Sequence, residues 1–269
     1  MPRLSVIMGV YNSKSIELLK KSIHSIIDQT FVDWEFIICN DGSTDNTLSI
    51  LEEIEMMDSR IKVVTYEENR GLSSALNYAL SFTTGEYIAR QDDDDISYPE
   101  RFQVELKFLS EHPEIGFVGC LADIYDDDGI WGTYYLEERP TAKSFLWSNP
   151  FIHPSVMIRK EVFEKAGGYR IAWETRRAED YDLFMRFYAT GYKGWNIQKK
   201  LYKYRVANGN QKHRKIKDRI QEAVVRAQGY KKLGLGIKSV PYVVKPIIIT
   251  LIPRSVFKRI KNVQYKNML

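Results

Sequence analysis

The chain has 269 residues, of which 44% are hydrophobic and 28% charged, and these proportions are ordinary for a soluble globular protein. Such a length forms one large domain, or one and a half average ones, and buries most of its surface without disulfide staples. The two cysteines, Cys39 and Cys120, lie in apolar runs, and no signal pattern begins the chain, which argues against a disulfide framework. We therefore expect two reduced, buried thiols in a cytosolic protein.

The net charge of +4 conceals an asymmetry. Residues 193–269 carry 20 Lys/Arg and 2 Asp/Glu, a balance of +18, whereas the first 192 residues carry 19 basic and 33 acidic residues, a balance of −14. This distribution favours an acidic site in the body of the protein. It also favours a basic tail that meets an anionic partner, either nucleic acid or a membrane surface.

The first part of the chain alternates between strand and helix patterns. Apolar, β-rich runs predict buried strands at residues 4–10, 35–39, 61–65 and 86–90. Apolar side chains three and four positions apart predict helices at residues 16–27, 47–54 and 69–80. Ser43 or Thr44 is the expected N-cap of the second helix. This alternation predicts a mainly parallel sheet with helices on both faces.

Past Pro99 the order of elements becomes mixed. Helices are predicted at residues 100–111, 160–166, 179–188 and 212–233, the last of them basic. Strands are predicted at residues 115–120, 130–135, 154–158 and 201–205. The first two of these strands flank an acidic turn, residues 126–129, which we expect to be solvated.

The most unusual stretch is the four-aspartate run, Asp92-Asp93-Asp94-Asp95. Adjacent negative charges repel one another, so a fold tolerates them in water or around a cation. Most acidic runs are solvated loops, and that is the alternative here. This run, however, follows the predicted strand at 86–90, and ligands of open α/β sheets bind at the carboxyl ends of strands. Its position favours a ligand site.

Further acidic groups end predicted elements: Asp41 follows the second strand, and Glu179-Asp180 starts a helix. Alone, Asp41 can be an N-cap or turn residue, and Glu179-Asp180 can simply favour the helix dipole. Together with the four-aspartate run they predict one acidic crevice above the strand ends. Such a crevice needs a cation, and oxygen ligands beside a pyrophosphate suit Mg²⁺ or Mn²⁺.

Missing motifs argue against other site types. No Cys/His spacing supports zinc, and no Gly-x-x-x-x-Gly-Lys-Ser/Thr loop supports a P-loop NTPase. No Gly-x-Gly-x-x-Gly follows the first strand, as a dinucleotide enzyme requires. That strand is instead followed by Tyr11 and Asn12, which can flank a base or a sugar. The alternative for Tyr11 is plain packing.

Several motifs follow one another along the chain: residues 5–12 (SVIMGVYN), 29–31 (QTF), 40–45 (NDGSTD), 69–71 (NRG) with Asn77, 92–95 (DDDD) with Pro99, and 179–182 (EDYD) with Arg186. In this order, over roughly residues 3–205, they resemble family 2 glycosyltransferases, which are inverting enzymes of the GT-A fold. The family pattern usually has Pro at Gly9 and often Asp at Asn40. We expect Gly9 to loosen the first turn, whereas Asn40 leaves Asp41 intact.

The resemblance implies a binding site for a nucleotide-sugar donor. Asp41 would accept a hydrogen bond from the base, typically uracil, and Val10 and Tyr11 would line the base pocket. Arg70 would touch the base or the phosphates; the alternative is a plain surface arginine.

The resemblance also implies different roles for the members of the four-aspartate run. Asp92, the first acid of the Asp-x-Asp element, would face the ribose or metal-bound waters. Asp94, the second, would bind Mn²⁺ or Mg²⁺ directly, and the metal would make the diphosphate a better leaving group. Asp93 is grouped with the donor-binding residues, although its role relative to Asp95 stays open.

On the acceptor side, Asp180 is the candidate general base. Inversion needs a single in-line displacement, in which a carboxylate removes the proton of the acceptor hydroxyl. Glu179 is a candidate contact for the acceptor or a phosphate. His153 falls where the family often places a site histidine; the alternative is a structural histidine.

The expected architecture is therefore an α/β GT-A fold with a basic C-terminal helical tail. We divide it into a glycosyltransferase domain at 1–210, with a nucleotide-binding half at 1–98 and a smaller acceptor-side half at 99–210, and a partly apolar extension at 211–269. Residues 241–253 are apolar but broken by prolines and shorter than the ~20 residues of a membrane span.

The composition of the tail favours a membrane surface over nucleic acid as its partner. Arg254, Lys258, Arg259 and Lys261 follow the apolar stretch, which suits an interfacial segment on an anionic membrane leaflet. The alternative is a packing or dimerising tail, and hence a homodimer. Nucleic acid is rejected as the main partner, because no known binding motif is present.

The sequence thus predicts a metal-dependent inverting hexosyltransferase. It would move sugar from a nucleotide-sugar, UDP-linked by preference, to a glycan acceptor on a lipid carrier in cell-surface polysaccharide synthesis, on the inner face of the cell membrane. One rival is a sugar-nucleotidyltransferase, whose Gly-rich basic loop is absent. Another is a nucleotide-sugar-binding protein without catalysis, against which the intact Asp180 argues.

Overall fold

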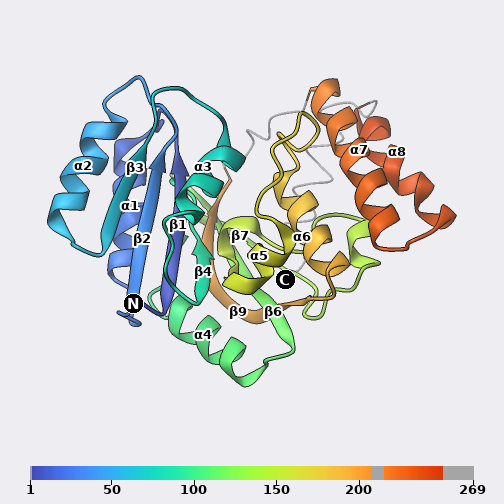
Figure 1. Cartoon of the computed structure of the whole chain (residues 1–269), viewed down its shortest axis with the longest axis horizontal. Coiled ribbons are helices and arrows are strands. Elements are labelled where there is room, and N and C mark those ends of the chain that lie inside the picture. Colours follow the sequence, from blue (N-terminus) through green and yellow to red (C-terminus); the bar gives the residue numbers. More distant parts are fainter. Residues whose placement is uncertain (1, 207–214, 251–269) are drawn as a thin grey trace.

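The computed structural model describes residues 2–206 and 215–250 of the chain (Figure 1). One nine-stranded sheet has the order β3-β2-β1-β4-β8-β6-β9-β5, and β7 pairs with β6 at its side. The strands are β1 (Leu4–Val10), β2 (Trp34–Asn40), β3 (Ile61–Thr65), β4 (Tyr87–Arg90), β5 (Ile96–Ser97), β6 (Ile115–Asp126), β7 (Gly129–Tyr134), β8 (Met157–Arg159) and β9 (Lys193–Arg205). The helices are α1 (Ile16–Ile27), α2 (Thr47–Met57), α3 (Leu72–Leu80), α4 (Arg101–Glu111), α5 (Lys160–Ala166), α6 (Glu179–Ala189), α7 (Ile216–Lys232) and α8 (Val240–Ile249).

Parallel pairing dominates the first half of the chain. β3, β2, β1 and β4 lie side by side in parallel, with Val10 beside Asn40 where β1 and β2 end. Beyond β4 the sheet is mixed, because β8 is antiparallel to both β4 and β6 whereas β6 and β9 are parallel. The predicted α/β fold, with a parallel sheet in the first half of the chain, is confirmed.

Alternate residues of β1 supply two cores, one on each face of the sheet. Val6 and Met8 belong to a cluster with α1, α2 and α4, whereas Ile7 belongs to a cluster with α3, α5 and α6. All three side chains are fully buried. A strand covered by helices on both faces requires this alternation.

Gly9 marks a close approach between β1 and α3. A Cβ atom at this position would lie 3.1 Å from Cβ of Ala75 and 3.2 Å from Cδ1 of Leu72. Gly9 lies inside β1 and not in the turn after it, so the expectation that it loosens that turn is wrong. The glycine instead permits tight packing of helix on strand.

Two predicted element boundaries are wrong for identifiable reasons. The N-cap of α2 is Asn46, because Ser43 and Thr44 are engaged by Asn12 of the preceding turn. The predicted strand at 154–158 begins as a 3-10 turn, His153–Ser155, and only then becomes β8. Pro154 has no N–H group to donate to a strand ladder.

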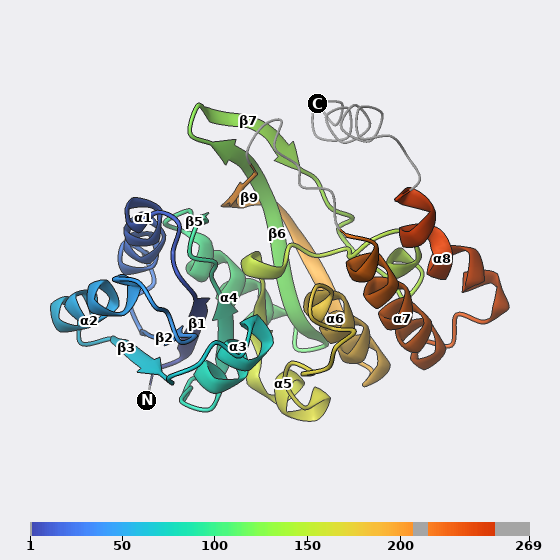
Figure 2. The ribbon, with the colours of Figure 1, turned by 90° about the horizontal axis from the view of Figure 1, so that it is seen from above.

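Two short features follow from strand pairing and charge. Ile96–Ser97, which lies between the predicted strand at 86–90 and the predicted helix at 100–111, forms β5 against β9. The acidic turn between β6 and β7 is confirmed as solvated, since Asp127 and Asp128 are exposed on a hairpin that reaches beyond the body (Figure 2).

The two cysteines are free and buried, and burial raises the pKa of each thiol to about 12.

The C-terminal helices α7 and α8 pack against each other, and α7 also packs against α6. The Tyr230 hydroxyl donates to the carbonyl of Phe145 at 3.0 Å, and Arg226 donates to the carbonyl of Leu146 at 3.1 Å. None of the helices in the described ranges has the length and apolar character needed to span a bilayer. The basic tail residues singled out from the sequence, Arg254, Lys258, Arg259 and Lys261, lie outside the described residues.

A fully buried guanidinium, that of Arg101, joins these layers at the start of α4. Its Nη1 donates to the carbonyl of Arg90 at 3.1 Å and to Oγ of Ser97 at 2.9 Å, and its Nη2 donates to the carbonyl of Val156 at 3.3 Å. Its Nε lies 3.2 Å from a carboxylate oxygen of Glu105, which is also fully buried. Burial raises the pKa of Glu105 to about 7, and the nearby Arg101 opposes the rise.

We expect Arg101→Met to lower the free energy of unfolding by about 3–5 kcal/mol at pH 8, because it leaves the Glu105 carboxylate buried without its cation. The loss should be smaller at pH 5. A carboxyl whose folded pKa is raised takes up a proton as the pH falls, and it loses stability as the pH rises through that pKa. Urea unfolding followed by circular dichroism at both pH values measures the difference.

Lys107→Met on the same helix is the matched control, since the Lys107 side chain is 72% exposed. This variant should change the unfolding free energy by no more than about 0.5 kcal/mol. Equal stabilities of the two variants at pH 8 would contradict a structural role for Arg101.

Candidate active site

The turns that follow β1 and β2 interlock at the edge where both strands end. The backbone N–H of Asn12 donates to Oγ of Ser43 at 3.0 Å, and the N–H of Thr44 donates to Oδ1 of Asn12 at 2.8 Å. Asn12 has a φ of 43°, a left-handed conformation that asparagine tolerates better than most residues. These bonds hold the two turns as one unit.

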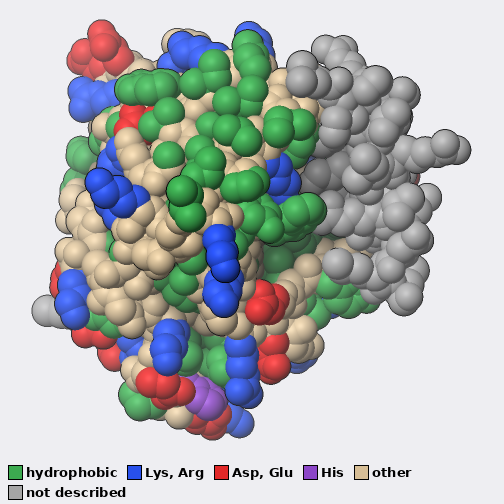
Figure 3. Space-filling model, turned by 90° about the vertical axis from the view of Figure 1, so that its right-hand side faces the viewer, with side chains coloured by type: hydrophobic (Ala, Val, Ile, Leu, Met, Phe, Trp, Pro, Cys, Tyr) green, Lys and Arg blue, Asp and Glu red, His purple; other side chains and the backbone are tan. Residues whose placement is uncertain are grey.

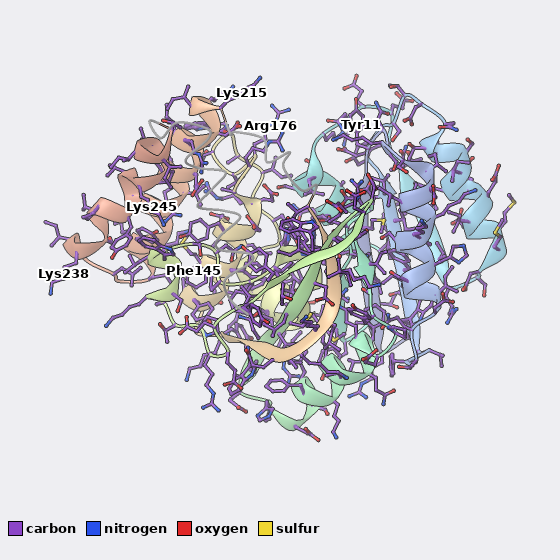
Figure 4. The ribbon with its side chains drawn as sticks, turned by 180° about the vertical axis from the view of Figure 1, so that it is seen from behind. Tyr11, Phe145, Arg176, Lys215, Lys238 and Lys245 are labelled. Carbon is purple, nitrogen blue, oxygen red and sulfur yellow. The ribbon has the colours of Figure 1, made fainter. Side chains whose placement is uncertain are left out.

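Of the residues predicted to line a base pocket, one points inward and one outward. The Val10 side chain is buried in the core, and its carbonyl accepts the N–H of Asp41 at 2.8 Å. The Tyr11 ring is 47% exposed, at the upper edge of the parallel half in Figure 4. Tyr11 therefore offers a ring surface to a ligand, whereas the Val10 side chain does not.

Asp41 is buried and accepts hydrogen bonds at both carboxylate oxygens. Oδ1 accepts the Tyr66 hydroxyl at 2.5 Å and the N–H of Arg70 at 2.8 Å. Oδ2 accepts Nδ2 of Asn69 at 2.8 Å and the N–H of Gly71 at 2.9 Å. Two bonds at each oxygen use the capacity of a carboxylate, so Asp41 organises the loop that leads into α3.

Arg70 leaves that loop as an exposed side chain. Its guanidinium lies 4.7 Å from the centre of the Tyr66 ring, in a cation–π contact. Asp41 therefore positions both partners of this contact, one through a hydroxyl and the other through a backbone N–H. The result is one exposed cation, Arg70, held beside the end of β2.

The four-aspartate run follows β4 and is held by arginines from two strands. Nη2 of Arg90, the buried last residue of β4, donates to Oδ1 of Asp92 at 2.6 Å. The backbone N–H of Arg205, at the end of β9, donates to Oδ1 of Asp95 at 2.7 Å. The Asp92 side chain is 30% exposed, whereas Asp95 is buried. The two ends of the run thus differ, one facing solvent and the other tied into the sheet.

Burial and repulsion between neighbouring acids raise the pKa values of carboxyl groups in the run. Burial, with help from Asp94 and Asp92, raises the pKa of Asp93 to about 7. Burial and Asp92 also raise the pKa of Asp94, although Arg205 opposes the rise. A divalent cation would relieve this cost, because it favours the ionised form of each carboxyl.

The residues present fit such a cation. The run supplies carboxylate oxygens, the ligand type that Mg²⁺ and Mn²⁺ prefer. Across residues 2–206 and 215–250 no group of three or more His, Cys, Asp or Glu side chains is arranged to hold a metal. This suits a site in which one or two carboxylates and the substrate phosphates share the ion.

Asp180 lies in the first turn of α6 with its carboxylate oriented by two donors. Nδ2 of Asn149 donates to Oδ2 at 2.8 Å, and the N–H of Tyr181 donates to Oδ1 at 2.7 Å. The other face of the Asn149 amide is fixed as well, since its Oδ1 accepts the N–H of Phe151 at 3.2 Å. Glu179 precedes Asp180 at the start of the helix, where the dipole favours negative charge.

The buried Tyr169 connects the two acidic groups electrostatically. Burial raises the pKa of its phenol, and Arg90 opposes that rise. Glu179, Asp92 and Asp180 all add to it, so carboxylates from both sides lie within electrostatic range of one hydroxyl. Acids predicted for both sides of the crevice thus act on the same buried hydroxyl.

His153 is buried and lies 2.8 Å, Nε2 to hydroxyl, from Tyr169. Burial and the charge of Arg90 lower its pKa well below the usual range, so the imidazole is neutral. Its ring packs edge-on against Phe184. In this structure it supports Tyr169 from within the core.

Sequence reasoning missed Arg90, Asn149 and Tyr169 as parts of the site. Arg90 carried a usable signal, because an arginine that ends a buried apolar strand needs a partner, and acids follow two positions later. Asn149 and Tyr169 lie in irregular segments. No periodicity or motif marks residues of that kind, so tertiary structure was needed to find them.

Comparison with known proteins gives a family. The model of "Glycosyl transferase family 2" matches residues 5–167. A Bacillus subtilis (strain 168) protein named as a glycosyltransferase, EpsE, is 38% identical over 259 residues, covering 96% of this chain and 92% of its own. An Escherichia coli UDP-Gal:alpha-D-GlcNAc-diphosphoundecaprenol beta-1,3-galactosyltransferase is 28% identical over 264 residues, covering 94% and 93%.

Solved structures share the fold at low identity. S. aureus TarS 1-349 in complex with UDP-GlcNAc aligns with a TM-score of 0.69 and 19% identity, over 88% of this chain and 72% of that one. The mannosyltransferase PcManGT from Pyrobaculum calidifontis, in complex with GDP-Man and Mn²⁺, aligns with a TM-score of 0.62 and 19% identity, over 99% and 81%. The chain belongs to glycosyl transferase family 2 and has the GT-A fold.

Proposed function

We propose that this glycosyltransferase is a metal-dependent, inverting hexosyltransferase that uses a UDP-sugar and extends a lipid-linked glycan in cell-surface polysaccharide synthesis. The observation that carries the proposal is that Asp92 of the four-aspartate run and Asp180 of α6 both lie within electrostatic range of the Tyr169 hydroxyl. One acidic group suits a donor diphosphate with its cation, and the other suits the removal of a proton.

In this proposal the donor lies over the ends of β1, β2 and β4. Tyr11 and Arg70 supply the exposed ring and charge for the base and phosphates. Because Asp41 already accepts four hydrogen bonds, it serves the donor through the loop that it holds, in place of a direct bond to the base. TarS, a neighbour of the same fold, has been solved with UDP-GlcNAc, which supports UDP as the carrier.

Asp94 and Asp92 would hold the cation. When bound, Mn²⁺ or Mg²⁺ would neutralise the charge that develops on the leaving diphosphate. Arg90 fixes the Asp92 carboxylate from the buried side, so that its free edge faces the donor. Asp93 adds negative charge beside them and stays in the donor-binding set.

Asp180 would act as the general base. The acceptor oxygen forms a bond to the anomeric carbon while the bond from that carbon to UDP breaks, and the hydroxyl proton passes to the Asp180 carboxylate. A single in-line displacement of this kind inverts the anomeric configuration. Asn149 holds the carboxylate in place, and Glu179 lies beside it for contact with the acceptor.

The acceptor and the location are proposed from a relative and from charge. The E. coli relative is named for a diphosphoundecaprenol-linked acceptor, which is a glycolipid. A lipid-linked acceptor places the enzyme at the inner face of the cell membrane, held there by its basic C-terminal part. A dimer formed through the same part is the competing arrangement.

Asp94→Asn should weaken Mn²⁺-dependent UDP binding by about tenfold or more, because it removes a carboxylate ligand of the cation. Calorimetry with UDP, with and without Mn²⁺, measures the effect. Asp128→Asn, an exposed acid on the β6–β7 hairpin, is the control and should bind as the unchanged chain does. If metal fails to strengthen UDP binding to the unchanged chain, the metal assignment is wrong.

Mn²⁺ affinity should rise about tenfold between pH 6 and pH 8. Without metal, the Asp93 carboxyl, with its pKa raised to about 7, is protonated at the lower pH and ionised at the higher one, and a cation favours the ionised form. Asp93→Asn should flatten the dependence. Calorimetric titration at pH 6, 7 and 8 tests this, and a flat profile in the unchanged chain would refute it.

Asp180→Asn should keep UDP affinity but lower the transfer rate by about a thousandfold, because the amide cannot accept the acceptor proton. The donor is first identified as the nucleotide-sugar that the unchanged chain hydrolyses slowly without acceptor, from a panel of UDP-, GDP- and TDP-sugars. Normal transfer by the variant would remove Asp180 as the base. No hydrolysis of any donor would count against the proposed activity itself.

A further inference from the structure

One face of the molecule is unusually apolar for a helical surface. Figure 3 shows hydrophobic side chains gathered over the side built by α7 and α8, with lysines and arginines among them. We call this the α7/α8 face. Exposed apolar residues in this part of the molecule include Trp147, Ile220, Ile237, Val240, Val244 and Ile248.

The outer side of α8 carries most of this face. Val240, Val244 and Ile248 stand four residues apart, so they share one side of the helix, and they are 54%, 42% and 55% exposed. The opposite side of α8 is already used, since Tyr242 and Val243 pack against the main core and Pro246 is buried. A helix on a water-facing surface normally turns polar residues outward, so this outer side favours an apolar or interfacial medium.

Cations and an aromatic ring accompany the apolar stripe. Residues 215–250 carry six lysines, whereas the two arginines of this segment, Arg219 and Arg226, are buried and pair with Glu222. The ammonium of Lys245 lies 3.5 Å from the centre of the Trp147 ring and donates to the Trp147 carbonyl at 2.6 Å, which holds the ring at the surface with 65% of Trp147 exposed. In Figure 4, Lys215, Lys238 and Lys245 all lie on the part built by α7 and α8, far from Tyr11.

We propose that the α7/α8 face docks on the surface of an anionic lipid bilayer. Tryptophan, aliphatic side chains and lysines on one surface match the layered chemistry of a leaflet, in which apolar residues enter beneath anionic headgroups. A second copy of the chain fits less well, because it would bring two positively charged faces together. The docking surface includes Trp147 as well as α7 and α8, and so extends beyond the C-terminal extension at 211–269.

The position of this face ties docking to the proposed reaction. Asn149, only two residues after Trp147, donates to the candidate base Asp180. A lipid-linked acceptor held in the leaflet would therefore reach the acceptor side of the site with its glycan leading. This step rests on the proposed function, whereas membrane docking itself does not.

The experiment is vesicle flotation of the full-length protein. One set of vesicles contains phosphatidylglycerol and phosphatidylcholine, and the other contains phosphatidylcholine alone. The double variant Val244→Glu/Ile248→Glu should need about tenfold more anionic lipid for half-maximal binding, since it puts two charges on the apolar stripe. Met56→Glu/Met57→Glu, on exposed side chains of α2, is the matched control and should bind as the unchanged chain does.

Each outcome decides something. Preference for the anionic vesicles and loss of binding in the α8 variant alone support the proposal. Equal binding by the α8 variant and the unchanged chain, or equal binding to both vesicle types, overturns it. A chain that binds no vesicles but forms a dimer that the α8 variant dissociates, by light scattering, also overturns it in favour of a second copy. Slow donor hydrolysis without acceptor should be the same in all variants, which separates a failure of docking from a failure of the proposed function.

Discussion

The site depends on a fully buried cation, the guanidinium of Arg101. Arg101 bonds to the backbone of Arg90 at the end of β4 and to Val156 just before β8, and it also holds Ser97 after the four-aspartate run. These contacts join the parallel half of the sheet to the mixed half at the point where the acids emerge. Glu105 balances the charge, and neither partner reaches solvent. Burial of such a pair is costly unless its remaining donors are also bonded, and here the guanidinium bonds to three different segments.

A second layer of arginines then shapes the acids themselves. Arg90 approaches Asp92 from β4, and Arg205 approaches Asp95 from β9. The run is therefore anchored to two strands that belong to different halves of the molecule, and burial raises the pKa values of Asp93, Asp94 and Asp95. A chain can keep four adjacent carboxylates in this way because the Arg90 guanidinium offsets the charge of Asp92, a backbone N–H bonds to Asp95, and burial favours the protonated form of the other acids.

Much of this arrangement could be predicted from local patterns. The strands of the parallel half, the helices between them and the acids at their ends all carried periodicity or motif signals, and these predictions are confirmed. Local patterns could not predict the hydrogen-bond partners of each acid. Asp41 has the position expected of a ligand contact, yet its hydrogen bonds go to Tyr66 and the loop before α3. The long-range partners Asn149 and Tyr169 come from irregular segments, where the fold and not the local sequence decides which atoms meet.

The interlocked turns after β1 and β2 have a consequence for engineering this enzyme. Asn12 forms hydrogen bonds with both Ser43 and Thr44, so neither turn can shift without moving the other. Exchanging one of them for the corresponding segment of a homologue would break the hydrogen bonds that join Asn12 to Ser43 and Thr44. Any exchange should therefore replace the two segments together, as one unit, and leave the strands beneath them unchanged.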